Sequence, residues 1–265
     1  MTTRTVLVIN SGSSSIKYQL VDPDSGESLA SGIVERIGDA TGSITHKRAG
    51  ERTDITEPVP DHGFGLSEVL RLFEEQGPSL ADAHIVAVGH RVVQGGRYFS
   101  GPALIDDDVV ARIEQLVPLG PLHNPAHLKG IEVGRRLLSD VPHVAVFDTA
   151  FFQDLPEEAA RYALDREVAD TYSIRRYGAH GTSHQFVSGA VSQLLGRDDL
   201  KQVVLHLGNG ASASAVVAGH AVDTSMGLTP LEGLVMGGRT GDIDPAAVFH
   251  LSRVAGMSID EIDHL

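Results

Sequence analysis

The residues that could carry chemistry gather at glycine-containing turns that follow apolar segments. The first turn, residues 10–15, lies between apolar residues 6–9 and residues 16–21, and it contains Asn10, Gly12 and three serines. The alternation of residue types predicts two strands joined by this turn. Convergent backbone N–H groups with Lys17 nearby favour an anion such as phosphate. A Ser/Gly hairpin that binds nothing is the alternative for this stretch taken alone.

The same pattern recurs in the second half of the chain. A shift of 198 positions places Val6 on Val204 and Gly12 on Gly210, within an apolar segment, a Gly/Asn/Ser turn and a second apolar segment. Such internal similarity is typical of duplicated architectures. Two phosphate-type hairpins in one chain predict two similar domains that face one nucleotide across a cleft.

Two arginines stand beside glycines and are candidates for binding anions. Arg91 follows the apolar residues 85–88 and precedes Gly95 and Gly96, while Arg239 directly follows Gly238. A guanidinium group pairs with a carboxylate or phosphate through two parallel hydrogen bonds. We therefore predict a functional role for both arginines, with a solvated loop charge as the alternative.

The composition excludes several classes of protein. The chain has 265 residues, 42 % of them hydrophobic, a net charge of −14 and no cysteine. This length accommodates one large or two modest domains. The negative charge argues against nucleic acids and anionic membranes as partners, and the chain shows no apolar run of membrane-spanning length. Without cysteine there is no disulfide framework, and we expect a cytoplasmic location.

The predicted elements alternate in the way that is typical of a mixed α/β protein. Beyond the two hairpins, strands are predicted at residues 28–36, 43–47, 53–57, 85–88, 144–147 and 220–224. Helices are predicted at residues 66–76, 108–116, 156–169, 183–195 and 245–255, and from Asn124 as N-cap with Pro125 as the first helical residue. Ser258 and Glu261 form a capping-box pattern close to the last residue. We therefore expect a first domain at residues 1–149, an incomplete second domain at residues 150–265, and an N-terminal part of a longer protein.

Other motif interpretations are weaker. Residues 208–213 match G-x-G-x-x-A, but a strand pattern follows them where a dinucleotide fold needs a helix. His180 and His184 have the spacing of a zinc helix, yet Gly181 replaces the glutamate of that motif. His127, His143 and His220 lack a supporting motif, so we interpret all three as structural or surface residues.

These motifs together resemble the acetate kinase family over residues 6–245. The matching segments are Asn10-Ser-Gly-Ser-Ser-Ser-Ile-Lys17, His90-Arg91-Val-Val, Pro121-Leu-His123-Asn-Pro125, Phe147-Asp148-Thr-Ala150, Tyr177-Gly178, His180-Gly-Thr-Ser-His184, His206-Leu-Gly-Asn-Gly-Ala-Ser212, Asp223-Thr-Ser-Met-Gly, Pro230-Leu-Glu-Gly and Gly241-Asp-Ile-Asp-Pro245. The resemblance implies duplicated actin/Hsp70-like (ribonuclease H-like) α/β domains with mixed sheets, the second incomplete, and a homodimer.

The resemblance also implies roles for individual residues. Asn10 would help to hold Mg²⁺, which Mn²⁺ could replace, and Ser13, Ser15 and His123 would belong to active-site loops. ATP would be the co-substrate. The nucleotide phosphates would contact Lys17, His206, Leu207, Gly208, Asn209 and Gly210. The substrate carboxylate would bind Arg91, with Val93, Leu122, Ala179 and Pro230 around its methyl group. The catalytic residues would be Asp148, His180 and Arg239.

The implied reaction is reversible transfer of the ATP γ-phosphate to acetate, which gives acetyl phosphate and ADP. Acetate is already ionised at neutral pH, so we expect Asp148 to orient Arg91 or a metal-bound water. Ala179, Gln94, Phe152, Gly238 and Thr240 depart from residues that are usual in the family. Propionate or butyrate kinase, or a non-catalytic nucleotide switch of the same fold, are the alternatives.

Overall fold

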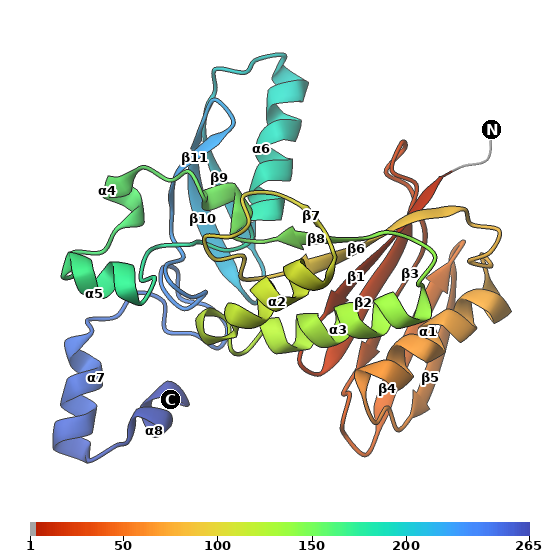
Figure 1. The fold of residues 1–265 in the computed structure, drawn as a ribbon, viewed down its shortest axis with the longest axis horizontal. Helices are drawn as coiled ribbons and strands as arrows, with labels where there is room; N and C mark the ends of the chain where they lie inside the picture. The colour runs from red at the N-terminus through yellow and green to blue at the C-terminus, as the bar shows by residue number, and fades with distance from the viewer. Residues whose placement is uncertain (1–3) are drawn as a thin grey trace. The chain divides into compact units, whose positions relative to one another are not determined.

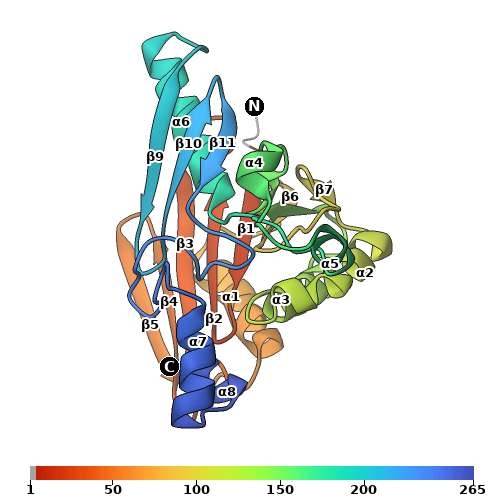
Figure 2. The same ribbon diagram turned by 90° about the vertical axis from the view of Figure 1, so that its left-hand side faces the viewer.

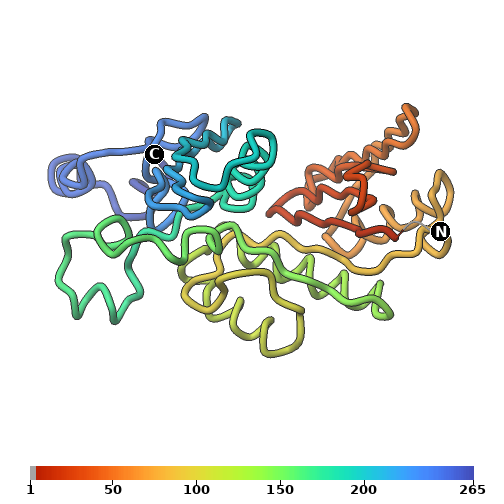
Figure 3. The backbone as a smooth tube through the Cα atoms, turned by 90° about the horizontal axis from the view of Figure 1, so that it is seen from above, coloured from red at the N-terminus to blue at the C-terminus, as the bar shows by residue number. Residues whose placement is uncertain are grey.

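The computed structural model describes residues 4–265, which form two compact units. Unit 1 holds the described residues up to Gln153 together with His180–Thr182. Unit 2 holds Asp154–Ala179 and Ser183–Leu265. The chain therefore leaves unit 1 after Gln153 and returns to it for three residues. Figure 3 traces the backbone with a colour scale by residue number.

An eight-stranded mixed sheet forms the centre of unit 1, in the order β5-β4-β3-β2-β1-β6-β8-β7. Its strands are β1 (Thr5–Ser11), β2 (Ser15–Val21), β3 (Ser28–Glu35), β4 (Gly42–Arg48), β5 (Glu51–Glu57), β6 (Ile85–Val92), β7 (Ala103–Leu104) and β8 (His143–Phe147). Strands β1 to β5 form an antiparallel meander, whereas β1, β6 and β8 run parallel. The structure thus confirms the mixed α/β fold class.

Two helices cover one face of this sheet, α1 (His62–Gln76) and α3 (Asn124–Leu137) (Figure 1). Leu7 and Ile9 of β1 point to the covered face and are 0 % and 1 % exposed. Helix α1 begins where the Asp61 side chain accepts a hydrogen bond from the Phe64 N–H, a cap that contributes about 1 kcal/mol. A Cβ at Gly130 of α3 would lie 2.6 Å from the Ser11 Cβ, so α3 can approach β1 this closely only with glycine there.

The remaining elements of unit 1 are short. Helix α2 (Asp107–Gln115) is capped by Asp106, and 3₁₀ turns cover Val117–Leu119 and Ala150–Phe152. One prediction needs correction here: Asn124 is the first residue of α3, and its N-cap is His123. The Asn124 side chain is buried and bonds to the Gln94 backbone, so it cannot also cap the helix.

Unit 2 contains a three-stranded antiparallel sheet in the order β11-β10-β9. Its strands are β9 (Lys201–Leu207), β10 (Ala211–Val217) and β11 (His220–Thr224), which agree with the predicted second hairpin and the strand after it. Helix α6 (Gly181–Leu195) runs beside this sheet (Figure 2). Hydrogen bonds from Gln202 to the Ser188 carbonyl and between His206 and Ser183 tie α6 to β9.

The prediction of one continuous helix at residues 156–169 is wrong. This segment is divided into α4 (Glu157–Ala160) and α5 (Arg166–Thr171), with Arg161 extended between them. The Asp165 side chain accepts from the Val168 N–H and starts α5 anew. The Tyr162 hydroxyl donates a hydrogen bond to Glu232, 70 residues further along the chain. This contact keeps residue 162 out of a continuous helix.

The C-terminal helices also differ in part from the prediction. Helix α7 (Ala246–His250) passes into a π-helical turn at Leu251–Ala255, which ends at Gly256 with a φ of 70°. The capping box of Ser258 and Glu261 is confirmed and begins α8 (Ile259–Asp263). Among residues 4–265, none of the helices has both the length and the hydropathy required to cross a membrane.

Candidate active site

Three predicted site residues of unit 1 come to one edge of its sheet. Asn10 lies near the end of β1, Arg91 near the end of β6, and Asp148 directly after β8. These strands are adjacent and parallel, with Ile9 opposite His90. Because parallel α/β sheets place their ligands at the carboxyl ends of the strands, this edge is the candidate site of unit 1.

Arg91 and Asp148 form the central pair of this edge. The Arg91 Nε lies 3.1 Å from both Asp148 carboxylate oxygens, and Nη2 lies 2.6 Å from Oδ2. The aspartate side chain is 3 % exposed and the arginine side chain 38 %. Burial alone would lower the pKa of Arg91, but the hydrogen bonds and charge of Asp148 raise it. The guanidinium is therefore a fixed cation whose orientation is set by a buried carboxylate.

The backbone of His180 lies beside this pair. The Gly181 N–H donates to the Asp148 carbonyl over 2.8 Å, and a Cβ at Gly181 would lie 2.2 Å from that oxygen. His180 itself has a φ of 60°, a left-handed conformation that is uncommon for a residue with a Cβ. Such backbone conformations concentrate at functional sites. The structure thus brings together three predicted site residues, Arg91, Asp148 and His180.

The first hairpin turn has the predicted form. Asn10 lies directly opposite Lys17 in the β1–β2 register, and the Gly12 N–H donates to the Ser15 carbonyl over 2.7 Å. His62 of α1 bonds to the Gly12 carbonyl from behind, also at 2.7 Å. The turn is therefore anchored at its glycine, while Ser13 and Lys17 remain exposed to solvent.

The residues predicted to surround the substrate methyl group differ in burial. Val93 and Ala179 are buried, Pro230 is half-buried, and Leu122 is exposed. Leu122 belongs to the short connection that leads through His123 into α3. Their assignment to an acyl pocket remains a prediction.

Sequence reasoning missed the His90–His143 pair and the burial of His127 in unit 1. His90 Nε2 lies 2.8 Å from His143 Nδ1, and burial lowers the pKa of His90 to about 3, with His143 and His127 adding to this effect. His127 is also buried; burial first, then the charges of Arg91 and His123, lower its pKa to about 4, against the opposing effects of Ser11 and Asp148. Neither ring nitrogen of His127 has a hydrogen-bond partner within residues 4–265. His90 belongs to the His90-Arg91-Val-Val segment, but no motif indicates its contact with His143 or the burial of His127, which only their spatial neighbours reveal.

The second hairpin turn has its own supporting contacts in unit 2. Its Gly208 N–H bonds to the Gly210 carbonyl over 3.1 Å, and the Asn209 carbonyl accepts from the Gly237 N–H over 3.2 Å. A Cβ at Gly237 would lie 2.2 Å from Asn209 Oδ1, so a larger residue at position 237 would require the Asn209 side chain to move. The predicted phosphate loop therefore packs against the segment that leads to Arg239.

A buried histidine supports this turn from the side of α6. His184 Nε2 lies 2.7 Å from Ser212 Oγ, and its Nδ1 lies 2.8 Å from Ser214 Oγ. Burial, aided by the charge of His206, lowers the pKa of His184 to about 4. The neutral ring has one donor and one acceptor, so one serine accepts a hydrogen bond and the other donates one.

Arg239 is held by its own loop. Its Nη1 donates to the Pro230 carbonyl over 2.9 Å and lies 3.7 Å from Met236 Sδ. A single bridge between Met236 and Arg239 closes the intervening Gly-Gly turn. In contrast with Arg91, Arg239 has no carboxylate partner among the described residues.

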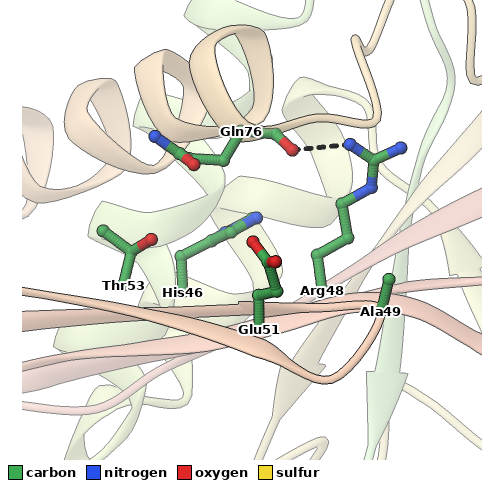
Figure 4. Close-up of a pocket in the computed structure, with 6 residues that line it drawn as sticks. All are labelled: His46, Arg48, Ala49, Glu51, Thr53 and Gln76. Atoms are coloured by element: carbon green, nitrogen blue, oxygen red, sulfur yellow. Dashed lines mark hydrogen bonds between the residues drawn. The ribbon is translucent and has the colours of Figure 1, made fainter.

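A half-open notch in unit 1 lies apart from these residues. It has a volume of about 160 Å³ and is lined by His46, Arg48, Ala49, Glu51, Thr53 and Gln76 (Figure 4). Arg48 donates to the Gln76 carbonyl over 2.6 Å. The notch lies between β4, β5 and the end of α1, and it contains none of the predicted site residues.

Comparison with known proteins identifies the family of this chain. The Acetokinase family model matches residues 5–265. The chain belongs to the acetokinase family. An acetate kinase of Corynebacterium aurimucosum is 57 % identical over 98 % of this chain and 65 % of its own length. An acetate kinase of Streptomyces coelicolor is 56 % identical over 100 % of this chain and 66 % of its own.

Solved structures of the family share the fold. A propionate kinase from Francisella tularensis superimposes with a TM-score of 0.92 at 42 % identity, and covers 98 % of this chain and 67 % of its own. Acetate kinase from Porphyromonas gingivalis gives a TM-score of 0.92 at 41 % identity, over 99 % of this chain and 67 % of its own. The duplicated actin-like α/β fold is thereby confirmed. The chain spans about two-thirds, 65–66 %, of the length of these curated relatives.

Proposed function

We propose that the protein transfers the γ-phosphate of ATP to the carboxylate of a short-chain acid, with acetate as substrate and acetyl phosphate and ADP as products. The observation that carries the proposal is the Arg91–Asp148 pair at the carboxyl ends of β6 and β8, in a chain that belongs to the acetokinase family. A protein that used nucleotide only as a switch would have no need for an arginine aligned to bind a small carboxylate.

Arg91 would bind the substrate carboxylate. Asp148 occupies Nε and Nη2 of the guanidinium, so Nη1 is the remaining terminal nitrogen. Nη1 donates no hydrogen bond within residues 4–265. An acid that bonded there would be held by a cation whose position is already fixed, which lowers the entropic cost of binding.

The chemistry requires no base. A carboxylate oxygen of the ionised acid attacks the γ-phosphorus, the bond to the β-γ bridging oxygen breaks, and ADP leaves with that electron pair. Positioning and neutralisation of charge dominate such transfers. Arg239 and His180 would stabilise the transferred group, and Lys17 with the 206–210 turn would contact the nucleotide phosphates. Asp148 acts by orienting Arg91.

A divalent metal accompanies ATP in this proposal. Across residues 4–265, no group of three or more His, Asp or Glu side chains is placed to hold an ion. Asn10 and the hydroxyls of Ser13 and Ser15 provide oxygen donors at one turn. This sparse set fits Mg²⁺, which keeps several waters and relies on phosphate oxygens, and Mn²⁺ accepts the same donors. Asn10 would hold the ion, which would neutralise phosphate charge when bound.

The remaining partners of the proposal follow from the family. We propose that the protein works as a homodimer in the cytoplasm, and that neither nucleic acid nor membrane is a partner, in keeping with its net charge of −14.

A hydroxylamine trap tests the proposal. The gene product at its full natural length is incubated with ATP, Mg²⁺ and acetate, propionate or butyrate, and acyl hydroxamate is measured. We expect acetyl hydroxamate. ATP hydrolysis without hydroxamate from any of the three acids would favour the switch instead.

Propionate is the second candidate acid. A structure with a TM-score of 0.92 is named a propionate kinase, and this chain has alanine at position 179. A higher kcat/KM with propionate than with acetate in the same assay would favour it.

A further inference from the structure

The loop that carries Pro230 and Arg239 contains little regular structure, although its conformation is held at many points. It follows β11 and extends from Ser225 to Asp242 without a helix or a strand. Its two ends are joined, because the Asp242 N–H donates to the Gly233 carbonyl and the Gly233 N–H donates to Asp242 Oδ1, both over 2.8 Å. Glu232 supplies further contacts that hold its middle part.

Both carboxylate oxygens of Glu232 are occupied by partly buried side chains of unit 2. Oε1 accepts from Arg176 Nη2 over 2.9 Å, and Oε2 accepts from the Tyr162 hydroxyl. Tyr162 lies between α4 and α5, and Arg176 lies five residues after α5. Burial, then the hydrogen bond and charge of Glu232, raise the pKa of Tyr162, so the hydroxyl remains a donor throughout the physiological range. We call Tyr162, Arg176 and Glu232 the Glu232 clamp.

The clamp also holds backbone groups at the start of the loop. Arg176 Nη1 donates to the Thr224 carbonyl over 2.8 Å, and its Nε donates to the Ala159 carbonyl over 3.2 Å. The Tyr162 hydroxyl accepts from the Leu228 N–H over 2.9 Å. Each side chain of the clamp thus joins segments more than forty residues apart in the sequence.

Gly227 shows how closely the loop is fitted to this clamp. A Cβ at residue 227 would lie 1.6 Å from Glu232 Oε2 and 2.1 Å from the Tyr162 hydroxyl oxygen. The Gly227 carbonyl accepts from the Tyr177 N–H over 2.9 Å and from the Gly178 N–H over 3.2 Å. Because Ala179 follows directly, the same anchoring reaches the segment that carries this predicted pocket residue.

We infer that Tyr162, Arg176 and Glu232 are positioning residues that fix the Pro230 carbonyl and, through it, the guanidinium of Arg239. Pro230 is two residues from Glu232, and its carbonyl is the oxygen that receives Arg239 Nη1 at 2.9 Å. Release of Glu232 frees that carbonyl to move and removes the fixed acceptor of Arg239. The expected loss of kcat rests on the proposed phosphotransferase function. The expected motion of the loop rests on the hydrogen bonds alone.

The kinetic test is a double-mutant cycle in the full-length gene product. We expect Glu232→Gln and Tyr162→Phe each to lower kcat by about 10- to 100-fold, because small displacements of a catalytic group cost this much. The KM for ATP should change less than kcat. In an Arg239→Ala background, the further effect of Glu232→Gln should fall below about threefold, since the group that it positions is gone. Independent, multiplicative losses in the cycle, or an unchanged kcat in both single variants, would overturn the inference.

A second readout does not depend on activity. Hydrogen exchange of the peptide that contains residues 225–242 should accelerate in Tyr162→Phe, since the Leu228 N–H loses its acceptor. Asp199→Asn is the matched control, because it breaks an exposed Arg197–Asp199 pair in the same unit and should leave exchange and kcat unchanged. If the wild type makes no acyl phosphate, the proposed function fails while accelerated exchange still supports the clamp. Unchanged exchange in Tyr162→Phe overturns the clamp whatever the activity.

Discussion

The two hairpins of this chain share a sequence pattern but bury opposite faces. In β1, Leu7 and Ile9 are 0 % and 1 % exposed, beneath α1 and α3. The residues 198 positions later, Leu205 and Leu207 of β9, are 56 % and 71 % exposed. Helix α6 contacts β9 through the alternate residues Gln202 and His206. The comparison teaches that the pattern determines strand and turn, whereas the helix that packs on the strand decides which alternate residues it covers within this 265-residue chain.

The two units also differ in how they hold their candidate site arginine. Arg91 of unit 1 is held by a buried carboxylate from the adjacent strand. Arg239 of unit 2 is held by a backbone carbonyl of its own loop. A charged partner aligns the guanidinium more strongly than a neutral one, so the loop of Arg239 depends on additional anchoring.

The largest expected effect is on the free energy of unfolding, when one leucine of each hairpin is shortened to alanine. Leu7→Ala should lower the free energy of unfolding by about 2–5 kcal/mol, because it leaves a cavity in a covered face. Leu205→Ala should cost less than about 1 kcal/mol, because this side chain is mostly in solvent. Urea unfolding of the 265-residue chain, followed by far-UV circular dichroism, checks both values. Equal losses of unfolding free energy in Leu7→Ala and Leu205→Ala would contradict the difference in exposure between these two side chains.

The two arginines should differ in their response to a lysine substitution. Arg91→Ala and Arg239→Ala should each raise the activation barrier by about 2–4 kcal/mol, measured from kcat/KM of the full-length gene product. Lysine should recover little at position 91, where the fork bonds Asp148 through two nitrogens, and more at position 239. Full activity in Arg239→Ala would contradict a catalytic role for this arginine.

Acid should destabilise the chain through its buried neutral histidines. The pKa of His127 is lowered to about 4, below the value of about 6.5 in an unfolded chain. Between these values the unfolded state binds a proton that the folded state does not, so stability falls as the pH falls from about 6.5 to 4 and loses nothing more below that range. The loss is on the order of 3 kcal/mol.

Urea unfolding at pH 7 and pH 4.5 tests this expectation. His127→Asn should flatten the pH dependence even if it lowers stability at pH 7. The exposed His220→Asn serves as control and should leave the slope unchanged. A slope that is the same in His127→Asn and the wild type would refute a neutral His127.

The smallest expected effect is on the choice of acid. We predict that Ala179 enlarges the acyl pocket and that Ala179→Phe shifts preference toward acetate, since one methylene in a fitted pocket is worth about 1–3 kcal/mol. The kcat/KM values for acetate, propionate and butyrate in both proteins measure the shift. The same acetate preference in both would indicate that a neighbour such as Phe152 fills the space.

The sequence by itself determined the features that rest on neighbouring residues. Alternation of apolar and polar residues predicted both hairpins, and glycines beside Arg91 and Arg239 marked the two candidate arginines. The capping box of Ser258 was equally readable, because its two partners are three residues apart. Each of these patterns reflects backbone preferences and hydrogen bonds that operate within one turn or one strand.

Only the tertiary structure decided the features that join distant segments. Asp148 reaches Arg91 across 57 residues because β6 and β8 are neighbours in the sheet. The bond of Tyr162 to Glu232 spans 70 residues, and it lies where the predicted helix at residues 156–169 is interrupted. His127 looked like an ordinary histidine until α3 placed it, without hydrogen-bond partners among the described residues, beside Arg91. The burial of a side chain and its hydrogen-bond partners depend on which elements become neighbours in the fold. Local sequence preferences do not specify which elements become neighbours.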